Sequence, residues 1–182
     1  METSSIFCPV CGGSLHISCP TCRHCDTCEY EDGGFILPVG TGVFLVTPDF
    51  KSFWMSKRKP GLLHAGCWQL PGGSVEPKES VEVAARREIL EETGIELGEL
   101  SGPVFNGSIV RPNGEKYWSV QYFVVTKQTP QDMEPEKHGP WQLFTWGEAK
   151  TVLCFGALHH LLQSGMDETW IRDICQCAFT HR

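Results

Sequence analysis

The sequence predicts an α/β sandwich, in which a mixed sheet lies between helices, with a small cysteine-rich module before it. Three observations predict this fold. Residues 39–165 contain both apolar strand-like segments and helical segments, which is typical of α/β domains. A glycine-rich turn runs directly into an amphipathic helix at 79–92. Six of the ten cysteines fall between residues 8 and 28, in closely spaced pairs. We therefore expect a module at 1–34 and a main domain at 35–182.

The first element is the cysteine-rich module, whose three Cys-x2-Cys pairs predict structural Zn²⁺. Disulfides rarely persist in a reducing cytosol, where cysteine pairs more often hold metal. The first pair, Cys8-Pro-Val-Cys11-Gly12, looks like the tight knuckle of a zinc ribbon. A gap of 13 residues before the third pair leaves room for a short hairpin. The expected ligands are therefore Cys8, Cys11, Cys25 and Cys28. The alternates are Cys19 and Cys22, and a two-zinc arrangement would add His16 and His24.

The charge of the chain argues against a nucleic-acid binder. The net charge is −7, and residues 1–34 hold one basic side chain, Arg23, against five acids, so phosphates would be repelled. We expect the module to cap the main domain or to bind a protein partner. A homodimer is a further possibility. The chain has no apolar run of about 18 residues and no signal-peptide pattern at its start. We therefore expect a cytoplasmic protein without a membrane partner.

The main domain is predicted from short apolar segments bounded by turn residues. In chain order we expect strands at 42–46 and 52–57, a helix at 79–92, strands at 104–110 and 117–126, a strand at 141–146 and a helix at 155–163. Asn113-Gly114 suits the positive φ of a turn between the third and fourth strands. Three prolines among polar residues make 127–140 a loop.

Three glutamates share one face of the helix at 79–92. At about 100° per residue, Glu88, Glu91 and Glu92 fall in the sector of the small apolar residues, which predicts that they face inward. Buried carboxylates repel one another unless a cation compensates them, and oxygen ligands at this density suit Mg²⁺ or Mn²⁺. The helix therefore predicts a divalent metal site.

The turn and helix together match a known motif, Gly-x5-Glu-x7-Arg-Glu-U-x-Glu-Glu-x-Gly-U, where U is a bulky apolar residue. The matching positions are Gly73, Glu79, Arg87, Glu88, Ile89, Glu91, Glu92, Gly94 and Ile95. So many fixed positions at fixed spacing make the match highly specific. The chain resembles a Nudix hydrolase over residues 39–165, and the resemblance implies metal-dependent hydrolysis of a nucleotide phosphoanhydride.

Within that family, the best local resemblance is to the nucleotide triphosphate diphosphatases that act on oxidised and thio-substituted guanine nucleotides. It rests on the segments 39–43, 57–59, 66–73 and 134–137, followed by Trp141 and Trp146. This resemblance implies hydrolysis of a nucleoside triphosphate, modified or damaged ones included, to monophosphate and pyrophosphate. Zinc ribbons also precede the domain in NADH pyrophosphatases, so a dinucleotide or nucleotide sugar such as NADH or ADP-ribose is the alternative. A non-catalytic sensor or zinc-dependent adaptor would predict an eroded motif, whereas this motif is intact.

Roles can be assigned to individual residues. Glu88, Glu91, Glu92 and the Gly72 carbonyl are the expected Mg²⁺ ligands, and Arg87 is expected to hold the carboxylates in place. The remaining catalytic candidates are Glu79 and the loop acid Glu136, with Glu134 as an alternative base. The expected substrate contacts are Arg58, Trp68, Gln69 and Leu70.

Overall fold

The computed structural model describes residues 38–76, 79–98, 100–110, 114 and 116–173, together with two short strands, β1 (Ile6–Phe7) and β2 (Ser14–Leu15). β1 and β2 pair antiparallel. The six cysteines predicted to hold zinc lie outside the described residues, as does most of the predicted turn at 111–114.

The main domain is built on a mixed sheet, as predicted. Its strands are β3 (Val39–Val46), β4 (Ser52–Lys57), β5 (Trp68–Gln69), β6 (Ser101–Val110), β7 (Lys116–Val125) and β8 (Gln142–Thr145). The order is β5-β4-β3-β7-β6, and β8 pairs with the other end of β4. β3 and β7 lie parallel at the centre and the other pairs are antiparallel. β5 was not predicted, because a two-residue strand is defined by its partner and shows no periodicity of its own.

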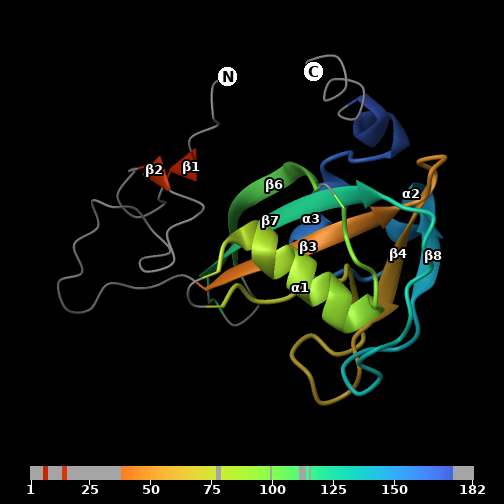
Figure 1. Ribbon diagram of the computed structural model, residues 1–182, viewed down its shortest axis with the longest axis horizontal. Coiled ribbons are helices and arrows are strands. Elements are labelled where there is room, and N and C mark those ends of the chain that lie inside the picture. The colour runs from red at the N-terminus through yellow and green to blue at the C-terminus, as the bar shows by residue number, and fades with distance from the viewer. Residues whose placement is uncertain are drawn as a thin grey trace.

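Helices cover both faces of this sheet, which confirms the expected sandwich. Figure 1 shows α1 (Val81–Thr93) in front of the sheet and α3 (Gly156–Gln163) behind it. Side chains of β3 alternate between the layers: Val43 and Leu45 pack in the cluster that includes Ile89 of α1. Phe44 and Val46 pack in the cluster that includes α3. A four-residue helix, α2 (Trp146–Ala149), follows β8 and was not predicted.

Helix α1 begins and ends at residues with specific caps. The Ser80 hydroxyl accepts the Val83 N–H at 3.2 Å, so the helix begins two residues later than predicted. It ends at Gly94, whose left-handed φ of 70° suits glycine. Both ends are therefore fixed, and the glutamates of the helix keep a defined direction.

The segment at 127–140 is irregular, as predicted, but backbone hydrogen bonds fix it to two elements. The N–H of Gln131 donates to Thr93 O at 2.9 Å, at the end of α1. The N–H of Gly139 donates to Lys57 O at 2.8 Å, and the N–H of Lys59 donates to Lys137 O at 3.1 Å, both at the end of β4. This loop therefore lies beside the acidic end of α1, the C-terminal half that carries Glu88, Glu91 and Glu92 (Figure 1). No helix among the described residues is long and apolar enough to cross a membrane.

Candidate active site

The turn at 71–74 lies between β3 and the acidic face of α1. The N–H groups of Thr41 and Val43 donate to the carbonyls of Gly73 and Pro71, at 2.8 and 3.0 Å. Gly72 has φ of 144°, and a Cβ there would overlap the Thr41 carbonyl, so only glycine allows this approach. Its N–H donates to Glu92 Oε2 at 2.8 Å, which ties the turn to the helix. A Cβ at Gly73 would overlap the Glu88 carboxyl group.

Arg87 binds three carboxylates and one carbonyl. Its guanidinium contacts both oxygens of Glu79, at 2.7 and 3.2 Å. It also donates to Glu88 Oε1 at 2.9 Å, to Glu91 Oε2 at 3.1 Å and to Ser74 O at 3.1 Å. The hydrogen bond to Glu79 raises the pKa of Arg87 further above its usual value, with a smaller contribution from Glu88. Arg87 thus lies among the motif's acids, and Glu79 is its bidentate partner.

The three helix glutamates differ in burial, although the sequence predicted that all three face inward. Glu92 is 4% exposed, whereas the side chain of Glu91 is 50% exposed. Burial raises the pKa of Glu92 to about 8, and neighbouring Glu88 and Glu134 add to the rise. Burial also raises the pKa of Glu88. Carboxyl groups buried this closely need a cation in order to ionise, and their hard oxygens fit Mg²⁺ or Mn²⁺.

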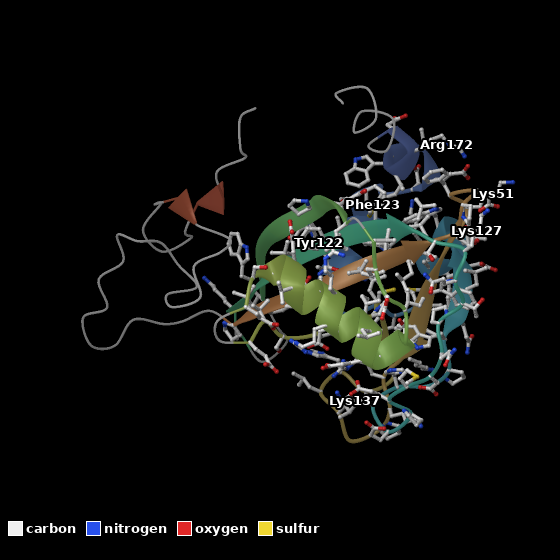
Figure 2. The ribbon with its side chains drawn as sticks, in the orientation of Figure 1. Lys51, Tyr122, Phe123, Lys127, Lys137 and Arg172 are labelled. Atoms are coloured by element: carbon white, nitrogen blue, oxygen red, sulfur yellow. The ribbon has the colours of Figure 1, made fainter. Side chains whose placement is uncertain are left out.

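The loop acids lie at different distances from this group. Glu134 is near enough to raise the pKa of Glu92, and its Oε1 accepts a hydrogen bond from Lys137 at 2.6 Å. Glu136 is exposed in the turn that follows. Figure 2 shows Lys137 on this loop, near the end of α1. Of the two loop acids, the structure brings Glu134 to the helix glutamates.

A cavity of about 240 Å³ opens beside Gly72 and Gly73, on the α3 side of the sheet. Of the predicted substrate contacts, Arg58, Gln69 and Leu70 line it. Arg58 donates from Nη1 to Gln69 Oε1, and its guanidinium lies 5.3 Å from the centroid of the Phe155 ring. The Trp68 ring packs against Phe144 instead, with centroids 4.6 Å apart, and joins the core.

Several lining residues of the cavity were not singled out from the sequence, among them two polar ones on β7. Ser119 and Gln121 are buried on β7, and Gln121 Nε2 donates to Ser119 Oγ at 2.8 Å. Gly42, the strand partner of Gln121, has no side chain to fill the space between them. The available signal was two polar residues on one face of an otherwise apolar strand. His138, which is buried beside Glu92 and Glu134, was also missed.

Comparison with known proteins gives a family match and two informative relatives. A model of the NUDIX domain matches residues 36–160. The RNA pyrophosphohydrolase of Caulobacter vibrioides (strain NA1000 / CB15N) is 32% identical over 120 residues, which cover 58% of this chain and 69% of that protein. A putative 8-oxo-dGTP diphosphatase of Bacillus subtilis (strain 168) is 43% identical over 65 residues, 36% of each chain.

Solved structures resemble the fold as well. The crystal structure of a MutT NUDIX hydrolase from Burkholderia pseudomallei superposes with a TM-score of 0.63 at 30% identity. The match covers 72% of this chain and 100% of that one. The sequence motif, the fold and the buried acids therefore coincide in one part of the molecule.

Proposed function

This chain belongs to the Nudix family and is a Nudix pyrophosphohydrolase, and from that premise we propose that it hydrolyses a nucleoside triphosphate to the monophosphate and pyrophosphate. The observation that supports this substrate class is the cavity beside the Gly72–Gly73 turn. At about 240 Å³ it is smaller than the roughly 300–1,000 Å³ of typical ligand pockets. It suits one nucleobase, with the phosphates extending to the acidic end of α1.

The acids of α1 and its preceding turn take the roles expected from the motif. Glu88 and Glu92, with Glu91 and the Gly72 carbonyl, would hold Mg²⁺ or Mn²⁺. When bound, this cation neutralises charge on the phosphates and lowers the pKa of an attacking water. Arg87 keeps the carboxylates at fixed positions through its bonds to Glu79, Glu88 and Glu91.

The proton of the attacking water must pass to a carboxylate. Glu91 is half-exposed whereas Glu92 is buried, so Glu91 is the first candidate, and in that role it would leave Glu88, Glu92 and the Gly72 carbonyl to hold the cation. Glu134 is the second candidate, because it is the loop acid close to the helix. Glu136 points to solvent from the turn, which makes it the weaker of the two loop candidates.

Substrate selection is assigned to the walls of the cavity. Arg58, Gln69 and Gln121 offer a guanidinium and two amides, which suit the oxygen and nitrogen atoms on the edge of a base. Gly40 and Gly42 keep the floor of the cavity free of side chains, and Phe155 supplies an aromatic wall. The preferred base, including any oxidised or thio-substituted guanine, would be set by these side chains.

A second candidate substrate is RNA, cleaved at a phosphoanhydride on its 5′ end, because RNA is the substrate that the Caulobacter relative's name states. The observation that favours it is a cavity of about 860 Å³ that adjoins the first and shares Tyr117 and Phe155 with it. A chain longer than one nucleotide could extend into that space. The net charge of −7 weighs against it, since most RNA-binding surfaces are basic.

A substrate panel with Mg²⁺ tests the proposal. We expect a nucleoside triphosphate to give pyrophosphate and monophosphate, with kcat/KM at least about tenfold above those for NADH and ADP-ribose, a ratio that a single fitted contact can supply. Products are measured by chromatography and a pyrophosphate assay. A 5′-triphosphorylated oligoribonucleotide is the matched comparison. A higher kcat/KM for that oligonucleotide, or for NADH or ADP-ribose, would replace the triphosphatase assignment.

We further propose that residues 1–34 hold structural Zn²⁺ through Cys8, Cys11, Cys25 and Cys28, with Cys19 and Cys22 as alternates. The support is the spacing of the cysteines and the antiparallel pairing of β1 with β2, which precede and follow the first pair in the sequence. A 34-residue segment has too little core to fold without such a ligand, so its order should depend on the metal.

Replacing Cys8 and Cys11 with serine should remove about one zinc per chain, or about two if the ions depend on each other, because serine cannot supply a thiolate. The measurements are elemental analysis and limited proteolysis of residues 1–34. Mg²⁺-dependent hydrolysis should persist, since thiolates and carboxylates select different ions. Cys67→Ser, at a partly buried cysteine of the main domain, is the control and should keep its zinc. Full zinc retention in the double variant would contradict the proposed ribbon.

A further inference from the structure

His138 has an unsatisfied ring nitrogen in the interior. The residue is 0% exposed, and its ring packs against Trp141 with centroids 4.7 Å apart. Nδ1 lies 3.0 Å from Gly139 O and 3.5 Å from Asp132 Oδ1. Nε2 is buried and has no hydrogen-bond partner among the described residues. A buried polar nitrogen without a partner is costly, so this atom calls for a ligand.

Glu134 has the same feature on the same loop. Its Oε1 accepts from Lys137 at 2.6 Å, whereas Oε2 is buried without a partner among the residues that the structure describes. Glu92, from α1, binds the Gly72 N–H through Oε2. Ligand atoms of Glu92, Glu134 and His138 all lie within 4.8 Å of one another. In each residue one polar atom is held by the protein, which leaves the other for a shared partner.

We propose that Glu92, Glu134 and His138 form a mixed nitrogen and oxygen cation site, in which His138 Nε2 is a direct ligand. The inference rests on the proposed function, because Glu92 belongs to the metal-binding acids of the motif. Gly139 O accepts the proton of Nδ1, and this fixes the tautomer in which Nε2 has a free lone pair. Imidazole suits Mn²⁺ and later transition metals better than Mg²⁺, so the site should favour Mn²⁺ over Mg²⁺.

Backbone hydrogen bonds hold the loop that carries Glu134 and His138 against β4 and α1. Residues 58 and 138 form an isolated antiparallel bridge, and the Gly139 N–H donates to Lys57 O at 2.8 Å. On the other side, the Met133 N–H donates to Glu92 O at 3.3 Å. The loop therefore cannot move away from α1 without losing backbone hydrogen bonds. With Glu134 engaged as a ligand, the half-exposed Glu91 is the carboxylate left to accept the proton of the attacking water.

Pulsed electron paramagnetic resonance of Mn²⁺ bound to the full chain tests the proposal directly. Protein labelled with ¹⁵N-histidine should show coupling between Mn²⁺ and an imidazole nitrogen. His138→Ala should lose that coupling and bind Mn²⁺ at least about tenfold more weakly by calorimetry, with a smaller loss for Mg²⁺. His159→Ala, at an exposed histidine of α3, is the matched control and should keep both. Mn²⁺ binds thiolates weakly, so the cysteines should not contribute to the signal.

The result that overturns the proposal is the absence of histidine coupling in the wild-type protein, or its retention in His138→Ala. His138→Gln replaces the alanine variant if the latter does not fold. Hydrolysis of nucleoside triphosphate with Mg²⁺ is measured on the same samples. Hydrolysis without nitrogen coupling refutes the histidine ligand alone, whereas coupling without hydrolysis refutes the proposed function and keeps the site.

Discussion

Replacing Glu92 with glutamine is expected to lower kcat by at least about 1,000-fold, because metal-ion stabilisation of a phosphoryl transition state contributes several kcal/mol. Glutamine keeps the shape of the side chain, and its carbonyl can still accept the Gly72 N–H that Glu92 accepts at 2.8 Å. The substitution therefore removes charge and not the contact between turn and helix. Steady-state kinetics at subsaturating Mg²⁺ measures the effect, and near-native turnover would refute the metal assignment.

The same substitution is expected to stabilise the metal-free protein above neutral pH. The pKa of Glu92 is raised to about 8, so between about pH 4.5 and 8 the folded protein retains a proton that the unfolded chain has released. The free energy of unfolding of the wild type thus falls as pH rises through that window. Glutamine does not titrate, so the variant should be more stable at pH 8 by on the order of 4 kcal/mol.

Urea denaturation at pH 5 and pH 8, without added Mg²⁺ or Mn²⁺, measures this difference. Added Mn²⁺ should reduce the difference in unfolding free energy between variant and wild type at pH 8, because the cation binds the folded wild type more tightly than the variant. Glu82→Gln is the matched control, since Glu82 lies on α1 but is exposed, and it should change neither kcat nor the pH dependence much. A wild-type unfolding free energy that does not fall between pH 5 and 8 would contradict the burial effect.

Arg87→Lys should raise the Mg²⁺ concentration needed for half-maximal kcat by about 10- to 100-fold, as expected when groups that orient metal ligands are lost. Lysine keeps the positive charge, but one ammonium cannot replace the planar fork that binds Glu79 through both oxygens and also reaches Glu88 and Glu91. The Glu88 carboxylate would lose its fixed position beside Gly73. The Mg²⁺ dependence of kcat measures the change.

The matched control is Arg86→Lys, on the adjacent position of the same helix. Arg86 donates instead to the carbonyls of Leu97 and Gly98. Its replacement should leave the Mg²⁺ activation constant within about twofold of the wild-type value. Substitutions that do not touch the acids of the site usually change little. If both variants shift the thermal midpoint equally but neither shifts the Mg²⁺ dependence, Arg87 has no positioning role.

Local patterns predicted most of the main domain. The helix α1 was predicted from its periodicity, with a start two residues too early because the cap at Ser80 was not recognised, and β4 was predicted with its observed bounds. The motif spacing also placed Arg87 beside Glu91, because residues one turn apart on a helix are neighbours. These features depend on residues close in the sequence, so the sequence alone is sufficient for them.

The sequence by itself determined the family, the order of the longer elements and the set of acids on α1. Only the tertiary structure decided how deeply each acid is buried, with Glu92 inside and Glu91 half-exposed. It also placed Gln69 in the cavity and Trp68 in the core, and it brought His138 to Glu92, 46 positions away. The physical reason is that burial and long-range contacts depend on which elements pack together, and periodicity along one segment does not contain that information.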